Sequence, residues 1–529
     1  MAASTTAGSA AAPQPAQADK ASLVTWLCVI AGMLGAFMAV LNIQITNASL
    51  ENIEGGIGTG ADNGAWISTS YLIGEIVVIP LTDYFSRVFS FRRTLIVNAA
   101  LFLAFSVACA FAANLTQMIV LRGFQGFTGG VLIPMAFTLI LRKLPQPQQP
   151  IGMAMFAITA TFAPAIGPTI GGYLTENYGW EYIFYVNLVP GAVMIGVLLM
   201  TLEREPMQLG LLRRGDWSGI VTMAIGLAAL QTVLEEGNKD DWFGSPFIVR
   251  LSIVAAVFLT VFLVIEFRVR EPLINLRLLA RRNFGLGTLS NLCFGFVLYG
   301  SVYLMPQYLA QVQGYNAEQI GFVMAWTGFP QLVVVPFVPW LIKKLDPRLV
   351  IVAGYAIFAG SCLMLVPISR DVASDQLFWP NVIRACGQAL ILAPLSGIVM
   401  VGITKQEAGG ASGLFNMTRN LGGAFGTALL TTIVTKREQF HSNIIGQSVT
   451  EFSEATRTRI ETLTDYFMAH GVSDPATATH QAIIAVGNTV KAQATVMAYG
   501  DAFGVLAVML IAGGLCIVFV RKGMGAGGH

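Results

Sequence analysis

Charged side chains are scarce in this sequence. Only 11% of its 529 residues are Asp, Glu, Lys or Arg, whereas soluble domains carry about 25%. Hydrophobic residues make up 55% of the chain, and they gather in runs long enough to cross a bilayer, which takes about 20 residues of helix. The composition therefore predicts an all-α polytopic membrane protein whose main surroundings are the lipid bilayer.

Several motifs that are missing from the sequence exclude classes of function. All six cysteines fall inside apolar runs, so we expect neither a disulfide framework nor a cysteine metal site. The chain has no G-x-x-x-x-G-K-[ST] motif, so no ATP site is expected. The net charge of +2 gives no indication of nucleic-acid binding. Because no nucleophile–base set or metal cluster is apparent, we expect no enzyme activity, no cofactor and no metal.

The apolar runs predict fourteen membrane helices. They follow residues 1–20, which are rich in Ala, Ser, Pro and Gln and are expected to form a disordered cytoplasmic tail, not a signal peptide. An even number of crossings places both termini on one side. The predicted helices are residues 22–48, 64–85, 94–113, 116–142, 150–174, 181–203, 217–235, 245–267, 283–312, 317–343, 347–367, 376–403, 408–434 and 492–520.

Lysine and arginine predict which side the termini occupy. Cytoplasmic loops of membrane proteins carry an excess of these residues. With a cytoplasmic N-terminus, the short outer loops hold only Lys239, Arg250 and Arg370. The loops on the other side hold many more, including Arg87, Arg92, Arg93, Arg142, Lys143, Arg281, Arg282, Lys343 and Lys344. Both termini are therefore predicted to be cytoplasmic.

An internal repeat predicts two related halves. Residues 80–92 (PLTDYFSRVFSFR) match residues 336–348 (PFVPWLIKKLDPR), and each segment follows a run that contains Ala-Trp. Parallel repeats of this kind occur in two-bundle transporters. The predicted units are an N-terminal six-helix bundle at 21–204, two extra helices at 205–270, a C-terminal six-helix bundle at 271–521 with an outer loop at 435–490, and a tail at 522–529.

Two motifs carry a family resemblance. Arg122-x-x-Gln125-Gly126 resembles the arginine motif on the fourth helix of the major facilitator superfamily. Residues 163–172 (APAIGPTIGG) resemble the antiporter motif on the fifth helix of that superfamily, with Ala163 at a frequent glycine position. Further similarities lie at residues 180–187, 216–219, 413–423 and 493–503. With fourteen helices, the chain resembles the EmrB-type drug:proton antiporters over nearly its whole length after residue 21.

The resemblance implies a fold, a function and partners. It implies the major facilitator fold, two six-helix bundles with two extra helices between them. It also implies a proton-coupled multidrug efflux permease of the bacterial inner membrane, which exports amphipathic compounds by alternating access and confers antibiotic resistance. EmrB-type pumps work with a periplasmic adaptor and an outer-membrane channel. Two alternatives remain: a dedicated exporter of one metabolite, lipid or siderophore, and a non-transporting assembly or sensor subunit.

The chain departs from the family at the expected proton site. Family members place an aspartate on the first helix in the pattern Leu-Asp-x-x-Ile-x-Asn, whereas this chain has Asn42 there. The inner-loop motif after the second helix is also altered, with Asp83 at a usual glycine position and Arg87 at a usual aspartate position. The motif continues to Arg92 and Arg93. A carboxylate other than the usual aspartate is therefore needed for proton coupling.

Glu75 is the first candidate for proton coupling. It lies near the middle of the second run, with no other charge between Asp62 and Asp83. A carboxyl group surrounded by hydrocarbon is favoured in its protonated form, so proton exchange near neutral pH is expected. Arg122 on a nearby helix is the predicted partner of Glu75, either in coupling or in a structural ion pair. The second candidate is Asp501, which we expect near the start of the last helix and near the outer face, where the helix dipole favours a carboxylate.

The remaining predictions concern the cavity, the moving parts and the outer loop. Arg384 is interpreted as a structural arginine that extends toward the membrane surface, and the histidines of the outer loop (His441, His470, His480) as solvated. The outer loop is predicted to form a surface helix hairpin on which an adaptor docks. The predicted substrate cavity is lined by Asn42, Gln44, Asn47, Gln125, Asn416, Arg419 and Asn420. The predicted conformational motif comprises Gly126, Pro164, Gly167, Pro168, Gly171, Gly172, Gly422 and Gly423.

Overall fold

The computed structural model describes residues 20–213, 215–269, 272–404, 407–450 and 452–521. The predicted terminal tails lie outside these residues, apart from residue 20. The N-terminal half contains α1 (Leu23–Ala48), α2 (Leu50–Ile57), α3 (Ala61–Gly64), α4 (Trp66–Phe89), α5 (Phe91–Ala110), α6 (Leu115–Lys143), α7 (Gln149–Tyr178), α8 (Tyr182–Tyr185) and α9 (Leu188–Thr201). The extra pair is α10 (Trp217–Glu236) and α11 (Pro246–Arg268).

The C-terminal half is helical as well. It contains α12 (Arg282–Gln311), α13 (Ala317–Ala325), α14 (Phe329–Val334), α15 (Val338–Lys344), α16 (Pro347–Met364), α17 (Ser374–Val399), α18 (Ala408–Ser448), α19 (Glu454–Ala469) and α20 (Pro475–Val518). Short 3-10 turns are η1 (Gln146–Gln148), η2 (Leu209–Arg213), η3 (Trp242–Gly244), η4 (Leu276–Ala280) and η5 (Val335–Phe337). No strand occurs in the described ranges, so the predicted all-α class is confirmed.

The helices are long and apolar enough to span a membrane. Among the described residues, 12 helical segments meet that test by length and composition. Helices α4 and α18 run through the same bundle but are more polar, because they carry buried charges such as Glu75 and Arg419. With these two, the crossings match the fourteen predicted runs closely.

The structure differs from the predicted runs in two places. The run at 317–343 is broken into α13, α14 and α15, because Gly328, Pro330 and Pro336 interrupt it and proline removes a backbone donor. The predicted outer loop at 435–490 is largely helical and extends two of the long helices outward: α18 continues to Ser448 and α20 begins at Pro475. No glycine or proline stops α18 between residues 436 and 445.

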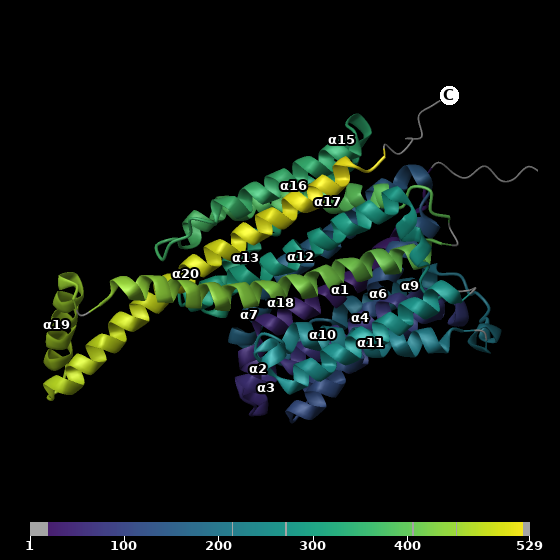
Figure 1. The fold of residues 1–529 in the computed structure, drawn as a ribbon. Coiled ribbons are helices and arrows are strands. Elements are labelled where there is room, and N and C mark those ends of the chain that lie inside the picture. Colours follow the sequence, from purple (N-terminus) through teal and green to yellow (C-terminus); the bar gives the residue numbers. More distant parts are fainter. Residues whose placement is uncertain (1–19, 214, 270–271, 405–406, 451, 522–529) are drawn as a thin grey trace, which may run out of the picture.

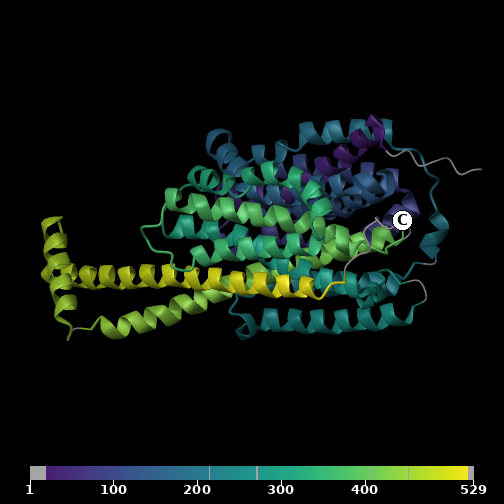
Figure 2. The same ribbon diagram turned by 90° about the horizontal axis from the view of Figure 1, so that it is seen from above.

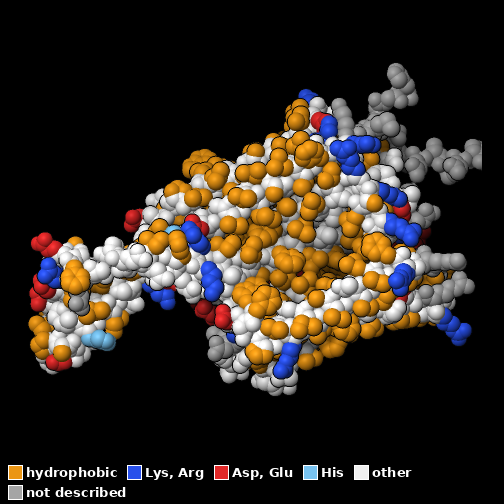
Figure 3. Space-filling model, in the orientation of Figure 1, with side chains coloured by type: hydrophobic (Ala, Val, Ile, Leu, Met, Phe, Trp, Pro, Cys, Tyr) orange, Lys and Arg blue, Asp and Glu red, His pale blue; other side chains and the backbone are white. Residues whose placement is uncertain are grey.

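The bundle has two distinct ends. Helices α18 and α20 project beyond it together with α19 (Figures 1 and 2), and we call this the hairpin end. At the other end α1 begins and α20 ends, and Lys and Arg side chains gather there (Figure 3). We call it the basic end. It is the end predicted to face the cytoplasm.

Glycines set the close packing inside each half, in the same way. A Cβ atom on Gly171 of α7 would lie 2.9 Å from the Ile45 carbonyl oxygen of α1. A Cβ atom on Gly426 of α18 would collide with the Phe296 carbonyl oxygen of α12. In both halves the fifth helix therefore touches the first through a G-x-x-x-G pair, which allows backbones to approach closely. This shared packing supports two related bundles.

The extra helix α10 contacts both halves at the hairpin end. Thr69 of α4 donates to Glu236 of α10 (3.0 Å). Trp242, just beyond α10, donates its indole N–H to Thr432 of α18 (3.0 Å). The extra pair therefore bridges the seam between the bundles and is more than a peripheral addition.

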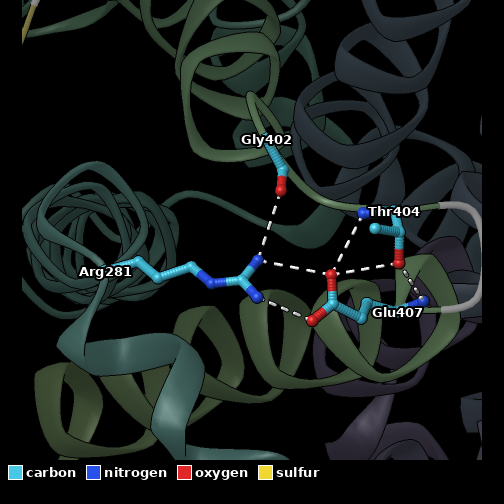
Figure 4. A network of polar contacts seen from close by, with 4 residues as sticks. All are labelled: Arg281, Gly402, Thr404 and Glu407. Carbon is cyan, nitrogen blue, oxygen red and sulfur yellow. Dashed lines mark hydrogen bonds and ion pairs between the residues drawn. The ribbon is translucent and has the colours of Figure 1, made fainter.

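A polar clamp joins α12 to α18 at the basic end (Figure 4). Arg281, next to the start of α12, contacts Glu407 before α18 at 2.7 Å and donates to the Gly402 carbonyl at 3.2 Å. Thr404 donates its amide and its hydroxyl to the Glu407 carboxylate, each at 3.1 Å. The Arg281 guanidinium, and then the Thr404 amide, hold the pKa of the Glu407 carboxyl below its usual value of 4.5.

We expect Glu407→Gln to lower the unfolding temperature modestly at neutral pH, because exposed ion pairs contribute on the order of 0.2–1 kcal/mol. A carboxyl whose pKa is depressed by folding stabilises the folded state above its ordinary value and loses that contribution as the pH falls through the folded pKa. The difference between wild type and variant should therefore be constant above pH 4.5 and shrink below it.

Thermal unfolding of the detergent-solubilised protein across pH measures this difference. Glu461→Gln, on the exposed face of α19, is the matched control and should unfold like wild type at every pH. A difference that persists unchanged into acid would contradict a role for the Glu407 charge.

Candidate transport site between the two bundles

A buried carboxylate connects the two halves near their centre. Glu75 lies on α4 of the N-terminal half and is 2% exposed. Its Oε1 accepts a hydrogen bond from Nδ2 of Asn420, on α18 of the C-terminal half, at 2.7 Å. Its Oε2 is buried without a hydrogen-bond donor among the described residues. The hydrogen bonding of Glu75 therefore depends on how the two halves are placed relative to each other.

Arg122 is not the ion-pair partner of Glu75. Its guanidinium donates to the side-chain oxygens of Asn42 and Gln125 and to the Ile67 carbonyl (3.4 Å), and it lies 4.3 Å from the centre of the Tyr71 ring. The expected direct Glu75–Arg122 pair is thus replaced by neutral acceptors. Asn42 supplies an amide oxygen to Arg122 at the place where the family has a carboxylate.

Arg419 lies on the other side of the seam and is fully buried. None of its three side-chain nitrogens has an acceptor within the described part of the chain. Its guanidinium lies 5.9 Å from the ring of Phe156 on α7, so it faces the opposite half. Tyr299 of α12 lies next to it and donates to Asn420 Oδ1 at 3.4 Å. Glu75, Asn420, Tyr299 and Arg419 thus form one polar cluster.

A second chain of polar side chains, which the sequence pattern did not predict, crosses the seam. Gln331 on α14 donates to Gln388 of α17 at 2.9 Å and to the Thr327 carbonyl at 2.7 Å. It also accepts from the hydroxyl of Thr161 on α7. Discontinuous helices often form binding sites in transporters, and the Gly-Phe-Pro-Gln segment at 328–331 was the available signal.

One residue predicted to line the cavity lies elsewhere. Asn47 is exposed at the end of α1, where its side-chain oxygen accepts from Ser68 (2.6 Å), because α1 reaches the hairpin end at this point. Gln44 is half-buried on α1, where its Cβ atom lies beside Gly167 of α7. Asn416 remains close to the seam: its Nδ2 donates to the Ser412 carbonyl (2.9 Å), while its Oδ1 is buried without a donor in the described residues.

The predicted conformational motif divides into two groups. Most of its glycines pack helices within one half: Gly126 touches the Tyr71 backbone, Gly422 touches Leu292 and Gly423 touches the Tyr299 ring. Gly172 of α7 differs, because its neighbour is the backbone of Ala317 in α13, across the seam. The prolines of the motif, Pro164 and Pro168, lie buried inside the continuous helix α7.

The inner-loop motif contacts the other half at the basic end. Asp83 forms an ion pair with Arg87 (3.2 Å). Its carboxylate also lies so close to Gly409, at the start of α18, that a side chain on Gly409 would collide with it. A carboxylate near a helix N-terminus is favoured by the helix dipole. Arg92 donates to the Leu199 carbonyl at 2.6 Å, and the Arg93 amide is capped by Ser90 (3.5 Å).

The predicted surroundings of three titratable or charged side chains, Asp501, His441 and Arg384, are wrong. Asp501 lies well inside α20, because that helix begins at Pro475. His441 is buried, not solvated: its Nε2 lies 2.7 Å from Asp501 Oδ2, and Arg437 Nε lies 2.6 Å from the same oxygen. Arg384 is 3% exposed and lies inside the C-terminal half, where it donates to the Ser301 carbonyl (3.4 Å).

Comparisons with known proteins agree with this architecture. A family profile described as "Major Facilitator Superfamily" matches residues 32–427. "Colistin resistance protein EmrB" of Acinetobacter baumannii is 31% identical over 498 residues, which is 94% of this chain and 96% of the relative. "Multidrug export protein EmrB" of Escherichia coli is 31% identical over 430 residues, 81% of this chain and 83% of the relative. A solved structure of the proton:xylose symporter XylE matches with a TM-score of 0.56 at 12% identity, covering 92% of this chain and 95% of that one.

Proposed function

This chain belongs to the major facilitator superfamily, among its EmrB-type permeases, and we propose that it is a proton-coupled exporter of amphipathic compounds. Export of several compounds is the function that the names of its relatives support. Proton antiport, alternating access and the location in a bacterial inner membrane with both termini cytoplasmic are our proposals. As a member of a transporter family, the chain is taken to be a transporter and not an enzyme.

The observation that carries proton coupling is the hydrogen bond between Glu75 and Asn420 (2.7 Å). A coupling carboxylate must respond to the conformation of the carrier and must be able to hold a proton. Glu75 fits the first requirement because its partner belongs to the other half. It fits the second because a carboxyl group buried in a low-dielectric site binds a proton more readily than one in water.

The same cluster suggests how substrate and proton exclude each other. A substrate that enters between the halves must displace Asn420 or Tyr299 from the neighbourhood of Glu75, or hold the halves apart. Either event changes the hydrogen bonding of Glu75 and therefore its affinity for a proton. The apolar rings beside the cluster, Phe137, Phe156 and Phe415, suit a substrate with a large hydrophobic part.

The test is transport into proteoliposomes under an imposed pH gradient. With an amphipathic dye such as ethidium outside and an acidic interior, a proton antiporter accumulates the dye. Collapse of the gradient with nigericin should abolish accumulation. Dye transport that ignores the gradient would contradict proton coupling, and a pump that moves one compound from a chemically broad panel would support the dedicated exporter. No transport of any compound would support the non-transporting subunit.

We further propose that the projecting hairpin of α18, α19 and α20 binds a helical segment of a periplasmic adaptor. The hairpin extends beyond the bundle (Figure 2), and it exposes apolar side chains: Phe452 is 94% exposed, Tyr466 54% and Ile484 49%. Exposed apolar clusters mark interaction sites. Site-specific photo-crosslinking from position 466 to a co-expressed adaptor is the direct check, and its absence in intact cells would argue against docking here.

A further inference from the structure

We infer that Arg419 is the positioning residue that controls proton release from Glu75. When the halves approach, the guanidinium on α18 pairs with the carboxylate on α4 and drives off the proton. When the halves separate, the pair breaks and Glu75 is protonated again. This inference rests on the proposed proton coupling and names the group that performs it.

The first support is the environment of Arg419. A guanidinium buried without a counter-charge is costly, because its desolvation penalty of several kcal/mol is not offset. Arg419 is fully buried, and no carboxylate pairs with it among the described residues, where the Tyr299 hydroxyl is the polar group beside it. Such a side chain is expected where an acceptor is reached in another conformation. Oε2 of Glu75 is buried and also lacks a hydrogen-bond partner there.

The second support is the comparison of the arginines near Glu75. Arg122 shares the N-terminal half with Glu75 and is held by Asn42 and Gln125 of that half. A rigid-body motion of the halves leaves these contacts unchanged. Arg419 lies on the other half, so the same motion changes its distance from Glu75. Its neighbour on α18, Asn420, already contacts Glu75 (2.7 Å), although the structure gives no direct ion pair between Arg419 and Glu75.

Few polar groups other than Arg419 lie close enough to Glu75 to control its proton. Helix α18 contributes Asn420 and Arg419, α12 contributes Tyr299, and α6 contributes Arg122. Tyr71 lies on α4 itself. Helix α10 has two carboxyl groups on the way to α4: Glu236 accepts from Thr69, nearly two turns from Glu75, and Glu235 accepts from Gln231 of its own helix. Helix α1 brings the neutral Asn42, and the charged residues of α5, Arg92 and Arg93, lie at its start. Among the described residues, Arg419 is therefore the cation of the opposite half that we expect to reach Glu75.

The proton step balances without another reactant. The O–H bond of the Glu75 carboxyl breaks and the proton passes to water on the open side of the carrier. The carboxylate then accepts hydrogen bonds from the Arg419 guanidinium, a charge-assisted and frequently bidentate contact. Asn420, the next residue on α18, holds Glu75 close to Arg419 in the structure described, at a stage before the pair forms.

Infrared difference spectroscopy across pH tests the inference on the purified full-length protein, without any substrate. The C=O stretching band of a protonated carboxyl group is assigned to Glu75 by its loss in Glu75→Gln. In Arg419→Gln the midpoint of that band should move to higher pH by about one unit, since a nearby positive charge favours the carboxylate. Arg419→Lys should remain near wild type.

The matched controls are the other two buried arginines. Arg122→Gln should shift the midpoint less than Arg419→Gln, and Arg384→Gln should not shift it. If Arg419→Gln does not fold, Arg419→Met keeps the volume without the charge. An unshifted midpoint, a larger shift for Arg122→Gln, or no band assignable to Glu75 would overturn the inference. If wild type shows no gradient-driven transport but Arg419→Gln shifts the Glu75 midpoint, the proposed function alone fails. If wild type shows gradient-driven transport but Arg419→Gln leaves the midpoint unshifted, this inference alone fails.

Discussion

Glu75→Gln should reduce gradient-driven transport to the background of protein-free liposomes. Glutamine keeps an oxygen that can accept the hydrogen bond from Asn420, so the contact between α4 and α18 is retained. It has no proton to exchange, so the carrier can no longer couple its cycle to the gradient. The measurement is the initial rate of dye accumulation in proteoliposomes with an acidic interior, beside wild type at equal reconstituted amounts.

Exchange of substrate across the membrane without a gradient separates coupling from folding. Because exchange does not require net proton movement, Glu75→Gln should retain it. The matched control is Asp501→Asn. Its carboxylate is bound to Arg437 and His441 at the base of the hairpin, far from Asn420, so we expect that variant to transport dye under a gradient. The opposite pattern, with Asp501→Asn inactive and Glu75→Gln active, would assign coupling to Asp501.

The sequence predicted Glu75 as a buried carboxyl group because it is the single charge between two distant acids in an apolar run, and its side chain is buried in the structure. Its partner was not predictable, since Asn420 lies 345 residues away and pairing across the halves depends on how the bundles dock. Arg122 was predicted as the partner because it is charged and lies on a nearby helix. In the structure its guanidinium instead donates to the side chains of Asn42 and Gln125. Hydrogen bonds made by Asn and Gln side chains cannot be predicted from a hydropathy pattern.

The boundaries of the helices were predictable where apolar runs end at polar loops. They failed where a helix leaves the membrane without a stop signal, as in α18 after residue 435. That error also misplaced His441 and Asp501, since both were interpreted as neighbours of a loop. Gln331 was missed for a different reason: it is uncharged, and its importance follows from the break between α13 and α14, not from its own type.

Gly172→Val should abolish gradient-driven transport while the protein stays folded. A Cβ atom at Gly172 would lie 2.5 Å from the Ala317 carbonyl oxygen and 3.1 Å from the Glu318 amide of α13. Thr169 already bonds the Gly321 carbonyl at this contact (2.6 Å), so α7 has no room to yield. Overpacking of about 1–3 kcal/mol would disfavour the contact between α7 and α13 by roughly 5- to 150-fold. If the chain works by the alternating access proposed above, it must form this contact between its halves in each cycle.

Gly426→Val is the control variant for this prediction. Its added atoms would strike the Phe296 backbone of α12, inside one half, where no rocking motion can relieve the overlap. We therefore expect a clear fall in unfolding temperature for Gly426→Val and little change for Gly172→Val, with transport lost in both. If both variants lost stability equally, the α7–α13 contact would be permanent packing. The bundles would then have to separate elsewhere at the hairpin end. The next contacts to test would be those of the extra pair, where Glu236 of α10 accepts from Thr69 of α4 and Trp242, just beyond α10, donates to Thr432 of α18.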